Sequence, residues 1–67
     1  MINTDKLQGI MRERKQTIAT LSEAIKLSKT GLFNKIHGKK EFVCSEMQEI
    51  KKILNLTEQE FEQIFFT

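Results

Sequence analysis

The sequence predicts an all-α fold, a compact bundle of four to five short helices that forms a single domain over residues 1–67. Proline is absent from the 67 residues. β-Branched residues never alternate with polar ones over the length of a strand, whereas apolar residues recur at helical spacing almost throughout. A chain of this length buries only about 60% of its unfolded surface, so we expect one domain of modest stability.

The first helix is expected from about Asp5 to Lys15. Asn3 or Thr4 can act as its N-cap, since each carries a side-chain oxygen that accepts a hydrogen bond from the first turn. The presence of Gly9 within this segment indicates close packing against a neighbour. Its inward face is formed by apolar residues at i, i+3 and i+4, namely Leu7, Ile10 and Met11.

Two short helices follow in close succession. One is expected over Ile18–Ile25 with Thr17 as its N-cap, because apolar or small residues fall at i, i+3, i+4 and i+7. The next is expected from a Ser28 cap to His37. It ends at Gly38, the residue that adopts a left-handed conformation at the lowest cost.

A fourth helix is expected over about residues 45–54. Ser45 and Gln48 have the spacing of a capping box at its start. Its inner face is formed by Met47, Ile50, Ile53 and Leu54.

The last helix is expected from Glu58 to about Phe66. Thr57 and Glu60 have the spacing of a second capping box. The residue before this cap and the residue four positions after it are Leu56 and Phe61, which suits a hydrophobic staple.

The charge of the chain is divided unevenly. Residues 1–40 contain nine Lys/Arg and three Asp/Glu, a net of +6, whereas residues 41–67 contain two Lys and six Glu, a net of −4. A positive region of this density favours a polyanionic partner, although such charges can also simply solvate helix faces.

Several classes of protein are excluded by what the sequence lacks. Cys44 is the only cysteine, which rules out an internal disulfide and a cysteine-cluster metal site, and we interpret it as a small apolar filler. Neither a membrane-spanning run nor a signal peptide is visible, so a cytoplasmic location is expected. The sequence shows no catalytic set, metal cluster or phosphate loop, and we expect no enzyme activity, no cofactor and no small-molecule ligand.

The segment from about residue 18 to residue 37 has the features of a helix-turn-helix. Two short helices joined by the three residues 26–28 must cross steeply. Their contact needs a small residue, which Ser22 provides. Apolar residues bracket the turn and line the inner face of the later helix, namely Ile25, Leu27, Leu32 and Ile36.

The outward face of the later helix can read DNA bases. If Leu32 and Ile36 are buried, the residues on the other side are Thr30, Phe33, Asn34 and His37. Asn34 can pair with adenine in the major groove, while Thr30 and Phe33 can contact a thymine methyl group. Phe33 has an alternative position, folded over the core toward the fourth helix.

Basic and polar residues flank this helix and can contact DNA phosphates. Lys29 and Lys35 can reach either guanine or a phosphate. His37 is more simply a polar residue at the helix end, with a phosphate contact left open. The expected phosphate contacts come from Arg12, Arg14, Lys15, Thr17, Lys35, His37, Lys39 and Lys40.

Residues 17–40, TIATLSEAIKLSKTGLFNKIHGKK, resemble the Cro/C1-type (XRE) helix-turn-helix family, especially the short repressor-like proteins of phages infecting Gram-positive bacteria. A TQEELAKKLGISKSTLSRKLNGK-like family pattern aligns without gaps on residues 17–39. The similarity continues through Glu41–Phe42, the amphipathic segment 45–54, Leu54–Thr57 and Ile64–Phe66. The resemblance implies a five-helix, lambda-repressor-like domain that binds operator DNA, usually as a dimer. It also implies base contacts from Lys29, Thr30, Phe33 and Asn34.

Three residues depart from the family pattern. Ile18 replaces the glutamine that commonly contacts DNA, so that contact does not carry over. Lys26 stands where the turn usually has glycine, which costs about 1 kcal/mol if its backbone is left-handed. Ser22 replaces the usual alanine and keeps the site small.

The resulting hypothesis is a sequence-specific transcriptional regulator, a phage repressor or Cro-like protein. It would bind a palindromic operator as a weak homodimer assembled on the DNA. Phe66 is expected at the dimer interface because, if Phe61 and Phe65 pack inward, helical geometry places Phe66 toward the rim. Alternatively, Phe66 folds onto the first helix. The rival function is a protein-interaction module without DNA binding, which would use the aromatic C-terminal helix.

Overall fold

The computed structural model describes residues 2–66, which form five α-helices and no strand. The expected all-α class is therefore confirmed. The Cα radius of gyration is 10.5 Å, close to the value of about 11 Å expected for a compact domain of this length. The helices are α1 (Thr4–Glu13), α2 (Ile18–Ala24), α3 (Lys29–Ile36), α4 (Cys44–Leu54) and α5 (Glu58–Phe65).

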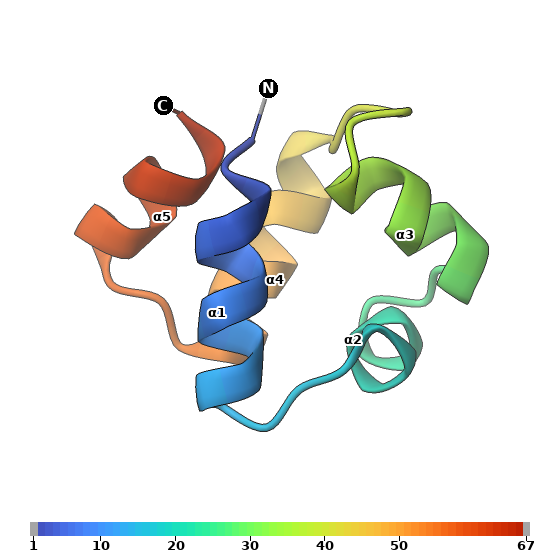
Figure 1. The fold of residues 1–67 in the computed structure, drawn as a ribbon, viewed down its shortest axis with the longest axis horizontal. Helices are drawn as coiled ribbons and strands as arrows, with labels where there is room; N and C mark the ends of the chain where they lie inside the picture. The colour runs from blue at the N-terminus through green and yellow to red at the C-terminus, as the bar shows by residue number, and fades with distance from the viewer. Residues whose placement is uncertain (1, 67) are drawn as a thin grey trace.

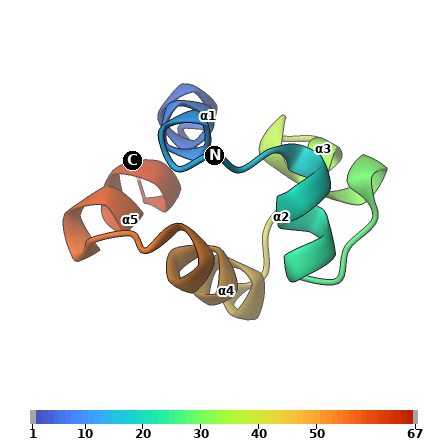
Figure 2. The ribbon, with the colours of Figure 1, turned by 90° about the horizontal axis from the view of Figure 1, so that it is seen from below.

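The helices are arranged so that α5 lies at one end of the molecule and the α2–α3 pair at the other, with α1 and α4 between them (Figures 1 and 2). Helix α1 packs against α5, and α2 packs against both α3 and α4. One end of the molecule is therefore formed by α5 and the other by the α2–α3 pair.

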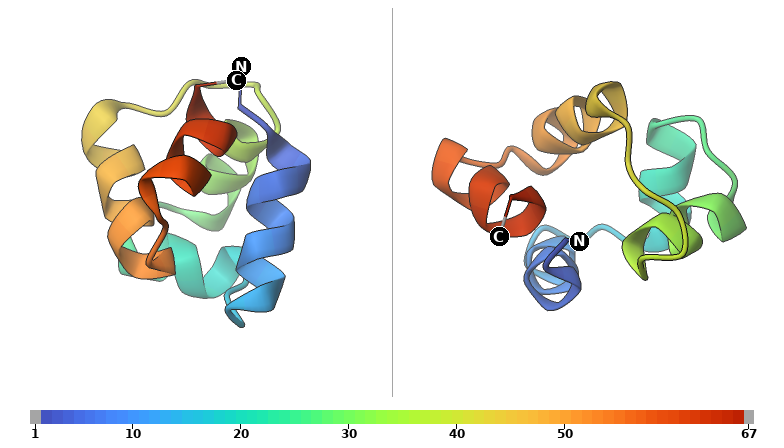
Figure 3. Two further views of the ribbon diagram at one scale, coloured as in Figure 1. Left: turned by 90° about the vertical axis from the view of Figure 1, so that its left-hand side faces the viewer. Right: turned by 90° about the horizontal axis from the view of Figure 1, so that it is seen from above.

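The start of α1 is tied to two other helices. The Asn3 N–H donates to the carbonyl oxygen of Ile64 at 2.7 Å, which places this start beside the end of α5 (Figure 3). The Thr4 hydroxyl donates to the carbonyl oxygen of Ile36 at 2.7 Å, at the end of α3. The last turns of α3 and α5 are thus both held by the first residues of α1.

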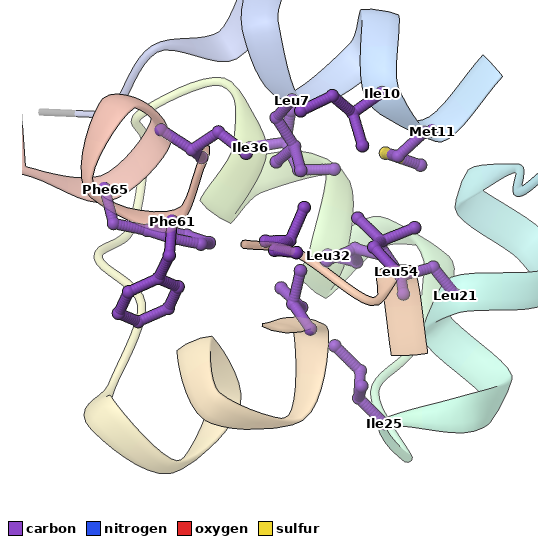
Figure 4. Close-up of a cluster of buried hydrophobic side chains, with 13 residues drawn as sticks. Leu7, Ile10, Met11, Leu21, Ile25, Leu32, Ile36, Leu54, Phe61 and Phe65 are labelled. Atoms are coloured by element: carbon purple, nitrogen blue, oxygen red, sulfur yellow. The ribbon is translucent and has the colours of Figure 1, made fainter. Parts of the chain in front are cut away.

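All five helices contribute to a single hydrophobic core (Figure 4). The three residues expected to face inward from α1 are buried, and most of the residues expected to face inward from the other helices are buried as well. Ile18, Leu27, Met47 and Ile53 lie at the edge of this core and are half-buried. The largest fully buried side chains are Leu7, Leu21, Leu32, Ile36, Ile50, Leu54 and Ile64.

Four of the five N-caps agree with the sequence predictions. The side chains of Asn3, Thr17, Ser28 and Thr57 each accept a hydrogen bond from a backbone N–H in the first turn of the following helix. At Thr57 the capping box is complete, since the Glu60 carboxylate in turn accepts from the Thr57 N–H at 3.0 Å.

The fourth helix starts differently from the expectation. It begins at Cys44, and the predicted capping box of Ser45 and Gln48 is wrong. The Glu46 carboxylate instead accepts a hydrogen bond from the Val43 N–H at 3.0 Å. Because Val43 has no side-chain oxygen, the return hydrogen bond from a backbone N–H of the first turn to an N-cap side chain is absent, and the capping box is only half formed. Cys44 is exposed in the first turn, so its interpretation as an apolar core residue is also wrong.

The first four helices end in the same way, through a residue with positive φ. These residues are Lys15, Lys26, Gly38 and Asn55, with φ values of 59°, 61°, 82° and 53°. In each case the residue after the one with positive φ donates its N–H to the carbonyl oxygen of the residue five positions before it. In the first helix, the Gln16 N–H donates to the Met11 carbonyl oxygen at 2.7 Å. This is the Schellman arrangement. The first helix therefore ends at Glu13 rather than at the expected Lys15.

Gly9 does not have the packing role expected from the sequence. A Cβ atom built at this position meets no atom within 4 Å. The glycine in α1 therefore marks open space rather than a close approach between helices.

Candidate nucleic-acid interface

The connection between α2 and α3 brings the two helices into steep contact. Figure 1 shows α2 almost end-on while α3 runs across the view. Ser22 is buried at 3% exposure, and its hydroxyl donates to the carbonyl oxygen of Ala19 at 2.9 Å. The left-handed conformation of Lys26 lets the Leu27 N–H donate to the carbonyl oxygen of Ser22 at 2.9 Å. A small side chain and a tight turn together allow the approach.

Helix α3 has a buried side and an exposed side. Leu32 and Ile36 are fully buried in the core. The four residues expected to contact bases lie elsewhere on the helix surface: Lys29, Thr30 and Phe33 are exposed, and Asn34 is half-buried. Three of these four side chains are therefore open to solvent, and the fourth is in part accessible.

Phe33 does not fold over the core. Its side chain is 44% exposed and is not part of the hydrophobic cluster. The ring instead contacts the imidazole of His37, one helical turn further along α3, with ring centroids 4.2 Å apart and an angle of 39° between the planes. The alternative position over the core is therefore wrong.

The turn after α3 carries the exposed residues Lys39 and Lys40. Their backbone N–H groups both donate to the carbonyl oxygen of Asn34, at 2.8 and 3.3 Å. The positive φ of Gly38 permits this return of the chain. The backbone of the two lysines is thus held close to the last turn of α3.

A second group of basic residues lies where α1 runs into α2. Arg12 and Lys15 are exposed there. In Figure 1 the end of α1 lies at the bottom of the view and the turn after α3 at the top. The expected phosphate contacts thus form two separate groups, with the α2–α3 pair next to both.

Thr17 is already used within the protein. Its hydroxyl accepts from the Thr20 N–H at 3.1 Å, and the Thr20 hydroxyl accepts from the Thr17 N–H at 2.8 Å. The Thr20 hydroxyl also lies 2.8 Å from the Gln16 side-chain oxygen. The sequence analysis did not identify Gln16 or Thr20 as part of the candidate interface. Their place there follows from the hydrogen bonds that link both side chains to the N-cap of α2.

Two residues expected to contact phosphates are engaged in ion pairs. Arg14 pairs with Glu60 of α5 at 3.1 Å, and Lys35 pairs with Glu46 of α4 at 2.6 Å. The partners lie 46 and 11 residues away in sequence. No local pattern could have predicted these contacts.

Both carboxyl partners have lowered pKa values. Burial alone would raise the pKa of Glu46, but the hydrogen bonds from Lys35 and the Val43 N–H, together with the Lys35 charge, outweigh it. The hydrogen bond from the Thr57 N–H, followed by that from Arg14, lowers the pKa of Glu60. At neutral pH both carboxyl groups are therefore ionised.

Other kinds of site have little support in residues 2–66. No group of three or more His, Cys, Asp or Glu side chains in this range is placed to hold a metal ion. None of the helices formed by these residues combines the length and apolar character needed to cross a membrane. A hollow of about 320 Å³ lies beside the start of α4. Its lining includes Lys35, which is already paired with Glu46.

Comparison with known proteins adds no family assignment. No family model, no curated protein and no solved structure was found to match the chain.

Proposed function

We propose that the protein is a sequence-specific DNA-binding transcriptional regulator in which α2 and α3 act as a helix-turn-helix. The observation that carries the proposal is the division of α3 into a fully buried side and an exposed side. The exposed side presents amide, hydroxyl, aromatic and ammonium groups. Such groups can match the hydrogen-bond pattern and the methyl groups of the major groove.

Charge and sequence similarity support the same function. The net charge of +6 over residues 1–40 would attract the phosphate backbone. The exposed residues Arg12, Lys15, Lys39 and Lys40 form the proposed phosphate-contacting set. His37, whose ring contacts Phe33, and Thr17, whose hydroxyl already bonds to Thr20, are not part of this set. Arg14 and Lys35 are left out of this set because their charges are paired. The resemblance to Cro/C1-type domains favours a phage repressor or Cro-like role acting in the cytoplasm.

The proposed assembly is a weak homodimer on a palindromic operator. Phe66 is 65% exposed, rather than folded onto α1, and α5 lies at the end of the molecule opposite α3 (Figure 2). Two protomers joined through α5 would have their α3 helices at the outer ends of the pair. To read two half-sites one turn of DNA apart, such a pair must hold its two α3 helices about 34 Å apart.

The interaction-module alternative has less surface available than the sequence indicated. Phe61, Ile64 and Phe65 are all buried in the protein's own core. Among the described residues of α5 and its C-cap, Phe66 is the one large apolar residue that is exposed.

Selection from a random pool of duplex DNA tests the proposal directly. The protein should enrich one sequence, and Asn34→Ala should weaken that site by about 10-fold or more while changing random DNA little. Changing Lys39 and Lys40 to alanine should weaken all sequences alike and reduce the salt slope by about one unit per lost contact. Lys52→Ala, an exposed lysine of α4, is the control and should leave the slope unchanged. A pool that stays random would contradict the proposal.

A further inference from the structure

The exposed ring of Phe33 is held by a neighbour on the same helix face. Large hydrophobic side chains are exposed at three of the described positions, Phe33, Val43 and Phe66, and Phe33 is the one that lies on α3. Its ring centroid is 4.2 Å from that of His37, within the range of favourable aromatic pairs.

The position of His37 is itself fixed. It is the C-cap of α3, and its N–H donates to the Phe33 carbonyl oxygen at 3.0 Å. The next residue, Gly38, then turns the chain back toward Asn34. The backbone of His37 is thus held in place, and its ring lies beside the Phe33 ring, where it occupies part of the space into which the Phe33 side chain could rotate. A restricted ring loses less conformational freedom when it contacts a ligand.

The chemistry of this ring pair suits one group of the major groove. Base edges there present hydrogen-bond donors and acceptors, with the thymine C5-methyl as the apolar exception. The phenyl ring can contact this methyl but can satisfy none of the polar groups. Asn34 lies next to Phe33 and carries the amide that suits adenine, so the two residues together fit an A·T-containing site.

We propose that His37 is a positioning residue that holds the Phe33 ring against a thymine methyl group, so that recognition of thymine depends on the pair rather than on Phe33 alone. This inference rests on the proposed function. It differs from a phosphate contact by His37, which would act on every sequence alike and would contribute to the salt slope.

The test uses the selected duplex with each thymine replaced singly by deoxyuridine, which lacks only the C5-methyl. For the unmodified protein, one thymine per half-site should show a loss of affinity of about 3- to 10-fold on replacement. Phe33→Ala should bind the thymine and deoxyuridine duplexes equally. His37→Ala should reduce the ratio between them while leaving the salt slope and the binding of random DNA unchanged.

Two further variants separate positioning from other roles of His37. His37→Phe keeps an aromatic ring without imidazole nitrogens and should restore the thymine preference. Lys52→Ala, an exposed change on α4 outside the proposed interface, should leave the loss on replacing that thymine unchanged. Because all of these residues are exposed, the variants should retain the melting midpoint, which circular dichroism checks.

The outcomes distinguish this inference from the proposed function. If a sequence is selected but no thymine is sensitive to replacement, the inference is wrong and the DNA-binding function stands. If His37→Ala weakens thymine and deoxyuridine duplexes equally and lowers the salt slope, His37 contacts phosphate and the positioning role is wrong. If no sequence is selected at all, the proposed function and this inference fail together.

Discussion

The Lys35 ammonium group in α3 lies 2.6 Å from both carboxylate oxygens of Glu46 in α4. Glu46 also accepts the Val43 N–H at the start of α4. One carboxylate therefore caps α4 and fixes the last turns of α3 against it. The orientation of the proposed recognition helix depends in part on this contact.

Replacement of Glu46 by glutamine should give a pH-dependent loss of stability. The pKa of Glu46 in the folded protein is below its ordinary value of 4.5. The unfolded state therefore binds more protons in this range, so the ion-pair contribution is present above about pH 4.5 and is lost as the pH falls through the folded pKa. We expect Glu46→Gln to cost about 1–2 kcal/mol at neutral pH and progressively less as the pH falls below 4.5 toward the folded pKa.

Urea unfolding followed by circular dichroism at several pH values measures this difference. Glu49→Gln, an exposed carboxylate on the same helix, is the matched control and should change stability by less than about 0.5 kcal/mol. A loss for Glu46→Gln that does not decrease as the pH is lowered below 4.5 would show that the charge of Glu46 is not the cause.

Gly9→Ala should stabilise the protein by about 0.5–1 kcal/mol, because Gly9 lies inside α1 and a Cβ there meets no atom within 4 Å. Gly38→Ala is the matched comparison. Its Cβ also meets nothing, but its φ of +82° is strained for alanine, so we expect a loss of about 1 kcal/mol or more. Thermal melting of both variants checks the opposite signs. Equal shifts would refute this explanation.

Thr57→Ala should destabilise the protein by about 1 kcal/mol, because the Thr57 hydroxyl accepts the Glu60 N–H at the start of α5. For a domain of this size the melting midpoint should fall by about 4–8 °C. Thr57→Ser retains the hydroxyl and should recover most of the loss. An unchanged midpoint for Thr57→Ala would mean that this cap does not support α5.

Phe66→Ser should abolish cooperative binding of two protomers to a palindromic operator while leaving the affinity for one half-site unchanged. Phe66 is the exposed C-cap residue of α5. Analytical ultracentrifugation with and without the operator measures the stoichiometry. Val43→Ser removes a second exposed apolar side chain and serves as the control. One protomer per operator, or cooperativity that persists in Phe66→Ser, would exclude this interface.

Much of the fold could be predicted from the sequence because the signals are local. Apolar spacing identifies the buried faces, and Thr17, Ser28 and Thr57 are strong N-cap residues. The helix ends were harder to predict. Gly38 suits a left-handed conformation, whereas Lys15 adopts one against its intrinsic preference because the Schellman hydrogen bonds and the following packing outweigh the cost.

The candidate site was less predictable, for a related reason. The 3.6-residue repeat alone separates Leu32 and Ile36 from the exposed face of α3. Whether a charged side chain forms an ion pair depends on which residues the fold brings near it. Lys39 and Lys35 look alike in sequence, yet only Lys35 has Glu46 within reach. Phe33 was ambiguous for the same reason until the position of His37 was known.

The hydrogen bond between the Asn3 N–H and the Ile64 carbonyl oxygen has a topological consequence. The two extremities of the described chain meet at one point, so a short peptide joining them would close the backbone into a ring without displacing any helix. Such a ring would restrict the unfolded chain far more than the folded one. It would also allow the backbone to be opened elsewhere, for instance in the exposed turn after α3, so that the same five helices would follow one another in a permuted order.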